Sequence, residues 1–121
     1  LYAFRTPSLR NIALTAPYGH AGAYADLADY LRHHADPEAG WAGYDRANAV
    51  LPEGFEDWRI ADDPAEVAAI LAAVEVDPLD LSEAEIAALV AFLDALTDPV
   101  AITGRLGVPE AVPSGLPVPM P

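Results

Sequence analysis

The amino-acid sequence predicts a mostly α-helical chain of about three helices joined by long loops and followed by a proline-rich tail. Three segments repeat apolar residues at the i, i+3 and i+4 spacing of one helix face, and each starts with Asp or Ser, which are typical N-cap residues. Between these segments, most of the 12 prolines and 8 glycines lie in stretches without a helical or strand period. At 121 residues the chain is one domain or part of one.

The composition restricts the classes of partner and site. A net charge of −13, from 19 acidic and 6 basic residues, repels nucleic acid and anionic membranes and attracts a basic protein or simply keeps the chain soluble. The absence of cysteine excludes disulfides, thiolate metal sites and covalent c-type haem attachment within this chain. No apolar run is long enough to span a membrane, and we find no signal peptide. Because the chain starts at Leu1, we expect it to be processed, cut or only partly represented.

Residues 4–23 are predicted to form a rigid loop with a short helical turn at most. Pro7 and Pro17 forbid a continuous helix through this stretch. It brings Arg5, Arg10 and His20 together immediately before a helix, which suggests a cofactor pocket. His20 could be a ligand, a propionate donor or a structural loop histidine, and spacing alone favours the last. Arginine binds carboxylates such as haem propionates in a bidentate manner, although surface ion pairs would explain the two cations equally well.

The first helix is predicted over 26–34. Asp26 has the position of an N-cap with Asp29 three residues later, and the apolar stripe consists of Leu27, Tyr30 and Leu31. His33 and His34 end this helix, and because successive side chains diverge by about 100°, both cannot face one metal ion. One is expected to point inward and the other into water, while the helix dipole is an alternative, structural reason for histidine here.

The next segment, 36–62, is predicted to be a long loop that starts where Asp36-Pro37 ends the first helix. It lacks a helical or strand period but contains isolated aromatic residues: Trp41, Tyr44, Phe55 and Trp58. A loop of this length usually covers another part of the structure or carries function. A family-variable insertion that only fills space is the alternative.

Two further helices are predicted, over 63–74 and 83–97. The first has Asp63-Pro64 at its start, and the second opens with a capping box from Ser82 to Glu85. The tail, 101–121, carries five prolines and is expected to be an extended, polyproline-like strap.

The residues themselves assign little chemistry. Lysine is absent, so all six cations are arginines, and neither a phosphate-binding glycine loop nor a nucleophile elbow is present. Three histidines without HExxH spacing specify no zinc site. We therefore assign no catalytic residue in this chain.

The segment FRTPSLRNIALTAPYGHAG, residues 4–22, strongly resembles the signature of bacterial di-haem cytochrome c peroxidases and of the related di-haem enzyme that matures methylamine dehydrogenase. Segments 81–98 and 112–118 resemble the last helix and the C-terminal tail of the same family. The resemblance implies that residues 1–121 form a single partial domain, the C-terminal portion of a cytochrome c-like second haem domain.

The same resemblance implies a set of site residues. The distal axial ligand of the haem iron, Met or Tyr in the family, falls on His34, with His33 as the fallback. Arg10 and His20 match cofactor-binding positions at the haem edge, and the backbone carbonyls of Thr15 and Pro17 match ligands of a calcium ion. The haem c itself would be attached through CxxCH motifs outside this chain.

The implied function is reduction of hydrogen peroxide by a di-haem c-type peroxidase-like oxidoreductase, in which this domain holds the electron-transfer haem. The expected partners are the remaining N-terminal haem-bearing portion and a small cytochrome c or cupredoxin electron donor, in the periplasm, and a homodimer is left open. Two alternatives remain: a haem-free interaction or structural subunit derived from the fold, and a di-haem enzyme that oxidises side chains of a partner protein.

Overall fold

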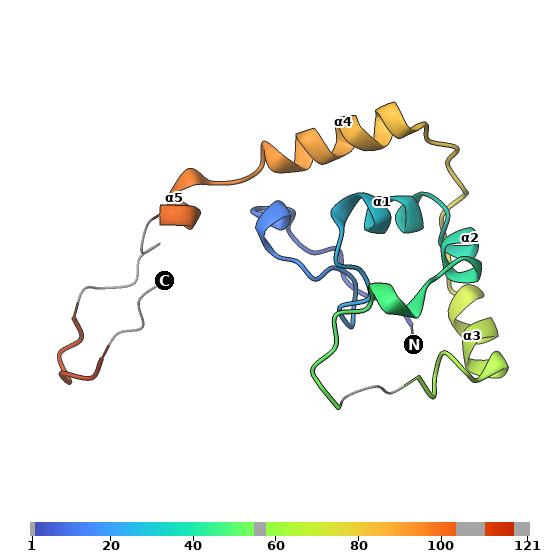
Figure 1. Cartoon of the computed structure of the whole chain (residues 1–121), viewed down its shortest axis with the longest axis horizontal. Coiled ribbons are helices and arrows are strands. Elements are labelled where there is room, and N and C mark those ends of the chain that lie inside the picture. The colour runs from blue at the N-terminus through green and yellow to red at the C-terminus, as the bar shows by residue number, and fades with distance from the viewer. Residues whose placement is uncertain (1, 55–57, 104–110, 118–121) are drawn as a thin grey trace.

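The computed structural model describes residues 2–54, 58–103 and 111–117. This part of the chain contains helices and no strand, so the prediction of a mostly α fold is confirmed. Within these ranges, five α-helices replace the expected three (Figure 1). The elements are η1 (Ile12–Leu14), α1 (Leu27–Ala35), α2 (Pro37–Ala42), η2 (Arg46–Asn48), α3 (Pro64–Leu71), α4 (Glu83–Asp94) and α5 (Pro99–Thr103).

Helix α1 lies at the centre of the packing. It contacts both α2 and α4, and η1 contacts α4 as well. Figure 1 shows α4 above α1, while α2 turns away from the end of α1 and α3 follows below it. In the described residues only six side chains are buried: Tyr18, Tyr24, Leu27, Ala35, Ile86 and Leu93. The core is therefore small, and it joins the loop before α1 to α1 and α4.

Two Asp-Pro pairs begin helices that the sequence analysis did not predict. Asp36-Pro37 ends α1 as expected, but it also starts α2, and Asp98-Pro99 likewise starts α5. The Asp36 carboxylate accepts a hydrogen bond from the backbone N–H of Ala39 at 2.9 Å, and the Asp98 carboxylate accepts one from Val100 at 2.9 Å. Proline is well suited to the first turn, where its missing N–H costs nothing.

These helices correct the predicted loop and tail. Helix α2 and the 3-10 turn η2 lie inside 36–62, and α5 extends into 101–121. Residues 55–57, 104–110 and 118–121 of those two segments lie outside the described residues. Within 111–117, a turn is closed by a hydrogen bond from the Gly115 N–H to the Val112 carbonyl at 3.0 Å.

Helices α3 and α4 end earlier than their apolar periods predict. Helix α3 ends at Leu71 instead of position 74, and α4 ends at Asp94 instead of position 97. The Val74 N–H bonds to the Leu71 carbonyl at 3.1 Å, and the Thr97 N–H bonds to the Asp94 carbonyl at 3.0 Å. Such i to i−3 bonds tighten the last turn into 3-10 geometry, so the apolar spacing continues past the α-helix.

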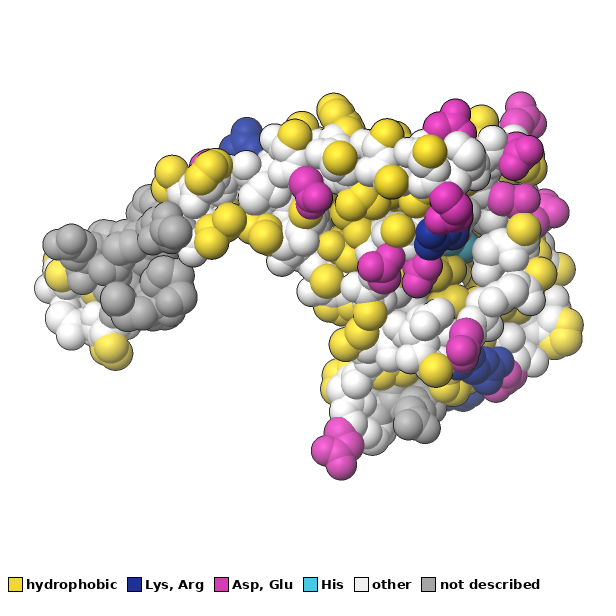
Figure 2. All heavy atoms as spheres, turned by 45° about the horizontal axis from the view of Figure 1, so that its top comes forward, with side chains coloured by type: hydrophobic (Ala, Val, Ile, Leu, Met, Phe, Trp, Pro, Cys, Tyr) yellow, Lys and Arg dark blue, Asp and Glu magenta, His cyan; other side chains and the backbone are white. Residues whose placement is uncertain are grey.

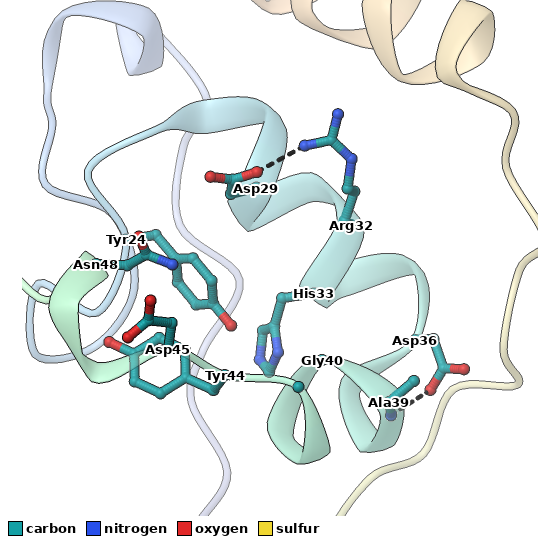
Figure 3. Close-up of a pocket in the computed structure, with 11 residues that line it drawn as sticks. Tyr24, Asp29, Arg32, His33, Asp36, Ala39, Gly40, Tyr44, Asp45 and Asn48 are labelled. Atoms are coloured by element: carbon teal, nitrogen blue, oxygen red, sulfur yellow. Dashed lines mark hydrogen bonds and ion pairs between the residues drawn. The ribbon is translucent and has the colours of Figure 1, made fainter.

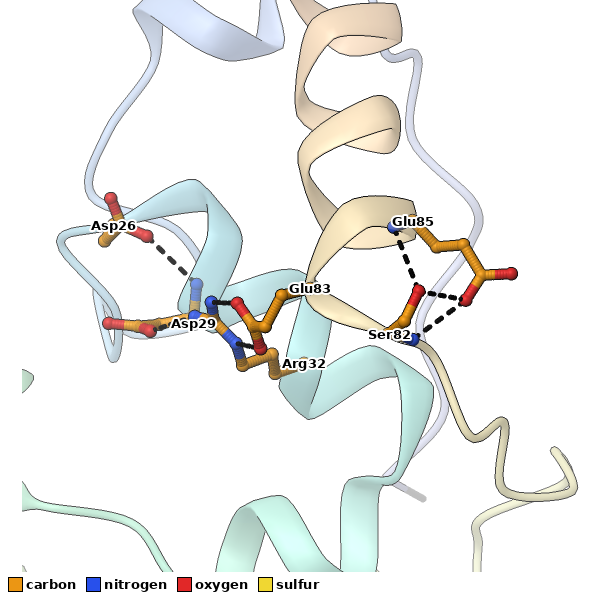
Figure 4. Close-up of polar contacts among 6 residues, drawn as sticks. All are labelled: Asp26, Asp29, Arg32, Ser82, Glu83 and Glu85. Atoms are coloured by element: carbon orange, nitrogen blue, oxygen red, sulfur yellow. Dashed lines mark hydrogen bonds and ion pairs between the residues drawn. The ribbon is translucent and has the colours of Figure 1, made fainter.

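The capping box of α4 is formed as expected (Figure 4). The Ser82 hydroxyl oxygen accepts from the Glu85 N–H at 3.4 Å, and the Glu85 carboxylate accepts from the Ser82 N–H at 2.8 Å and from its hydroxyl at 2.7 Å. This pair satisfies backbone donors that the first turn of a helix leaves without partners.

Ser82→Ala is expected to lower the free energy of unfolding by about 1 kcal/mol, because alanine cannot accept the N-cap hydrogen bond. Urea unfolding measures this effect. Ser114→Ala is the matched control, since Ser114 is exposed and no hydrogen bond of its side chain is found in the described part of the chain. An equal stability change in the two variants would show that the cap does not stabilise α4.

No helix within the described residues has both the length and the apolar character that crossing a membrane requires.

Candidate functional site

The loop before α1 is closed by a short β-bridge. The Tyr18 N–H bonds to the Tyr24 carbonyl at 2.7 Å, and the Tyr24 N–H bonds to the Tyr18 carbonyl at 3.1 Å. Gly19 and Gly22 allow this closure, because their φ angles of 84° and 70° lie in the left-handed region. His20 lies between them and is exposed. The bridge therefore presents His20 on the outside of a closed loop.

The two residues expected at the haem edge are both exposed. The His20 ring contacts Phe4, with 4.6 Å between ring centroids, and Phe4 is itself 71% exposed. The Arg10 guanidinium makes no hydrogen bond or ion pair with any other described residue. No direct contact between Arg10 and His20 is found there either. Both side chains are therefore available to a group that is not part of the described chain.

Asn11 fixes this loop to the end of α4, and sequence reasoning did not identify it. Its N–H donates to the Leu96 carbonyl at 3.2 Å, and its side-chain oxygen accepts from the Asp98 N–H at 2.7 Å. Asn11 has a φ of 58°, a conformation that asparagine tolerates better than most residues. Asparagine at a turn was the available signal.

The residues expected to bind calcium provide only some of the oxygen ligands that a calcium site needs. The carbonyl oxygens of Thr15 and Pro17 accept no hydrogen bond from the described residues, whereas the Thr15 hydroxyl and N–H both donate to Ile12. Two free carbonyls suit calcium, which takes six to eight oxygen ligands. No group of three or more His, Asp or Glu side chains that could hold a metal is found in the described part. The calcium site stays a prediction.

The two histidines of α1 have different environments, as the divergence of successive side chains predicts. His33 is half-buried, and its Nδ1 is buried without a hydrogen-bond partner in the described structure. It packs tightly against Gly40 of α2, where an added Cβ would lie 2.5 Å from that nitrogen. His34 is exposed, and its ring contacts Tyr30 edge to face at 4.5 Å. Of the two, His34 is the more accessible from outside.

Both imidazoles favour the neutral form. Burial, and to a lesser extent the neighbouring His34, lowers the pKa of His33. Surrounding atoms also shield His34 enough to lower its pKa below the ordinary value of 6.5. Neutral imidazole is the form that ligates metals. Both rings are therefore in the ligating form at neutral pH.

An open hollow of about 340 Å³ lies beside His33 (Figure 3). Tyr24 and Tyr44 form part of its wall, and carboxylates from Asp29, Asp36 and Asp45 lie around it. Of the residues expected to bind a metal or cofactor, only His33 lines it. The hollow is therefore separate from the loop that carries Arg10 and His20.

A cluster of aromatic rings joins the loop to α1, and this too was missed by sequence reasoning. Tyr24 contacts Tyr30, His33 and Tyr44 with centroids 5.5, 5.3 and 5.3 Å apart. The Tyr44 hydroxyl donates to the Ala23 carbonyl at 2.6 Å, which ties the segment after α2 to the loop. Burial raises the pKa of Tyr24 and of Tyr30, so these phenols stay protonated. Tyr44 thus packs against the loop, and covering another part of the structure is one of the three roles considered for 36–62.

Arg32 links α1 to α4 (Figure 4). Its guanidinium pairs with Glu83 at 2.6 Å and with Asp29 at 2.6 Å, and all three side chains are exposed. The hydrogen bond from Arg32, followed by its charge, holds the pKa of Glu83 below the ordinary value of 4.5. The pair connects the helix that carries both histidines to the first residue of α4.

The Arg32–Glu83 pair is expected to make stability depend on acid. Because the folded state lowers the pKa of Glu83, the contribution is complete above the ordinary value of 4.5 and is lost as the pH falls below it. Urea unfolding at a series of pH values should therefore show a smaller acid-dependent loss in Glu83→Gln than in the unmodified protein. Glu85, whose pKa is also lowered, is present in both proteins and cancels. Identical pH profiles would contradict a role for this pair.

A comparison with curated proteins finds a relative that matches most of this chain. Over 101 residues the chain is 37% identical to the methylamine utilization protein MauG of Paracoccus denitrificans (strain Pd 1222). The match covers 78% of this chain and 23% of that protein, so the chain spans well under a third of its relative. No family model matches, and no solved structure matches. The similarity to MauG supports the resemblance to di-haem c-type proteins at a coarse level.

Proposed function

We propose that this chain forms part of a di-haem c-type peroxidase-like oxidoreductase and supplies the distal axial ligand and pocket of the electron-transfer haem. The observation that carries the proposal is the exposed position of His34 on α1. Its exposed imidazole lies at the position where the family resemblance expects the axial ligand, on a helix that starts directly after the signature loop. The similarity to MauG over 101 residues supports the assignment to di-haem c-type proteins at a coarse level.

The exposure of His34 fits a haem ligand better than the half-buried position of His33. The neutral imidazole of His34 makes no hydrogen bond within the described part of the chain, so its nitrogens remain available. One ring nitrogen of His33 is instead buried against Gly40. Histidine is a competent axial ligand and would change the potential relative to methionine. His34 is therefore our choice, and His33 the fallback.

The loop provides side chains suited to the edge of a haem. Phe4, Leu9 and Leu14 expose 71, 46 and 51% of their surfaces, so these apolar side chains are open to a group outside the described chain. Arg10 supplies a guanidinium suited to a propionate, and His20 supplies a second polar group beside Phe4. Haem c, when bound, supplies reversible one-electron transfer at its iron.

The small core agrees with a chain that packs against more protein. Figure 2 shows hydrophobic side chains over much of the visible face, including the ridge formed by α4. On α4, Phe92 is 56% and Leu89 37% exposed. We propose that the remaining N-terminal haem-bearing portion, with its CxxCH motifs, covers part of this surface. We further propose that calcium is bound partly through the carbonyls of Thr15 and Pro17. The whole protein is proposed to be periplasmic and to receive electrons from a small cytochrome c or cupredoxin.

The reaction proposed for the whole protein is reduction of hydrogen peroxide. A second candidate is oxidation of side chains in a partner protein. The relative's name favours it, because it assigns that protein to methylamine utilisation, and the resemblance includes the di-haem enzyme that matures methylamine dehydrogenase. The two candidates share the proposed role of His34 and differ only in what the other haem acts on.

The full-length native protein tests these proposals. Haem quantification is expected to give two haems per polypeptide, and peroxide is expected to drive oxidation of a reduced small cytochrome c. Two haems without peroxidase turnover, but with peroxide-dependent oxidation of a partner protein, would favour the second candidate. The absence of haem iron would overturn both and leave a haem-free interaction subunit.

A further inference from the structure

Tyr30 is the nearest aromatic neighbour of His34 in the described structure. The two ring centroids lie 4.5 Å apart, with an interplanar angle of 70°. His33 is more distant from His34, at 6.2 Å. Tyr30 and His34 are four residues apart on α1, a spacing that brings two side chains together on one helix face. The edge-to-face contact restricts rotation of the imidazole.

A histidine that ligates a metal normally has the rotation of its imidazole ring restricted by a second contact. Its second ring nitrogen usually donates to a carboxylate or carbonyl, and this bond fixes the plane of the ring. His34 makes no such bond with the part of the chain that the structure describes. The contact with Tyr30 is therefore the feature best placed to hold the ring.

Tyr30 is itself held from the side of the loop. Its ring stacks on Tyr18 at 6.1 Å with an angle of 12°, and it contacts Tyr24 at 5.5 Å. At Gly19, an added Cβ would lie 3.6 Å from the Tyr30 ring, so the closed loop packs directly on it. Tyr18 and Tyr24 are both buried. The rigid loop therefore restrains Tyr30, and Tyr30 restrains His34.

We propose that Tyr30 is a positioning residue that sets the plane of the His34 imidazole as an axial ligand and couples that plane to the loop. This inference rests on the proposed function. Tyr30 itself would not ligate the iron. Its effect reaches the haem through His34 only, so it should change the ligand geometry without removing the ligand.

The test compares Tyr30→Leu with Tyr30→Phe in the full-length haem-bearing protein, using low-temperature EPR of the ferric state. The g-values of low-spin haem report the orientation of the axial imidazole plane. Tyr30→Phe keeps the ring and is expected to give the native g-values. Tyr30→Leu removes the ring and is expected to shift or broaden the signal while the haem stays low-spin. Circular dichroism melting would show whether either variant has lost its fold.

His34→Ala, measured in parallel, separates the two hypotheses. If His34→Ala abolishes the low-spin signal but a folded Tyr30→Leu keeps native g-values, Tyr30 has no positioning role and the proposed function stands. If Tyr30→Phe changes the signal as much as Tyr30→Leu, the hydroxyl and not the ring contact matters, and the inference is wrong. If His34→Ala leaves the signal unchanged, the ligand assignment fails and the inference fails with it.

Discussion

Replacing His34 by alanine is expected to convert one haem of the full-length protein from six-coordinate low-spin to five-coordinate high-spin. Alanine cannot ligate iron, and the other imidazole of the helix has its Nδ1 buried against Gly40. Electronic absorption and EPR spectra measure the spin state, and redox titration should show a shifted potential because axial-ligand identity sets it. This is the largest functional effect that we expect from a single substitution in the chain.

His20→Ala is the control for this experiment, because it removes an exposed imidazole from the neighbouring loop. It is expected to leave the spin state unchanged and to affect the potential only modestly. His33→Ala should likewise retain the low-spin haem. If His33→Ala loses the low-spin signal and His34→Ala keeps it, the assignment of the two histidines must be exchanged.

Gly40→Ala is expected to produce the largest loss of stability among our predictions. The added Cβ would lie 2.5 Å from His33 Nδ1, 3.0 Å from its Cα and 3.2 Å from its Cβ. The Cα is backbone, so the clash cannot be relieved by moving the imidazole alone. Overpacking of this kind costs about 1–3 kcal/mol, against a helix-propensity gain of about 1 kcal/mol for alanine over glycine. Urea unfolding should show a net loss of up to about 2 kcal/mol.

Gly43→Ala provides a matched control three residues further along the chain. Its added Cβ would meet only the Ala39 carbonyl, at 3.5 Å, which is an ordinary contact, and its φ of −97° suits any residue. We expect no loss of stability there, or a gain of up to about 1 kcal/mol from the reduced entropy of the unfolded chain. Equal losses at positions 40 and 43 would indicate a general intolerance of alanine, and no specific role for the His33 contact.

The sequence predicted those helices that begin with an N-cap residue and end at a residue that stops a helix. Asp26 and Ser82 accept the N-cap hydrogen bonds expected of them. Asp36-Pro37 is ambiguous in sequence because one dipeptide can end a helix and start the next. The hydrogen bond from Ala39 to the Asp36 carboxylate, which decides between these outcomes, forms only once the chain has turned.

The candidate site was predictable only in part. The divergence of consecutive helical side chains predicted that His33 and His34 would have different environments, but not which of them would be exposed. That outcome depends on Gly40, which comes close to His33 only after α2 forms. The tyrosine cluster depends on the bridge between Tyr18 and Tyr24, a pairing with no sequence period to reveal it. Long-range packing of this kind cannot be read from local spacing.

The central claim, that His34 ligates a haem iron, can be tested directly by near-infrared magnetic circular dichroism of the full-length ferric protein. The charge-transfer bands of low-spin haem distinguish bis-histidine ligation from histidine–methionine and histidine–tyrosinate ligation. We expect one haem with the bis-histidine signature, and we expect His34→Ala to abolish it. A histidine–methionine or histidine–tyrosinate signature in the unmodified protein, or a bis-histidine signature that survives His34→Ala, would contradict the claim.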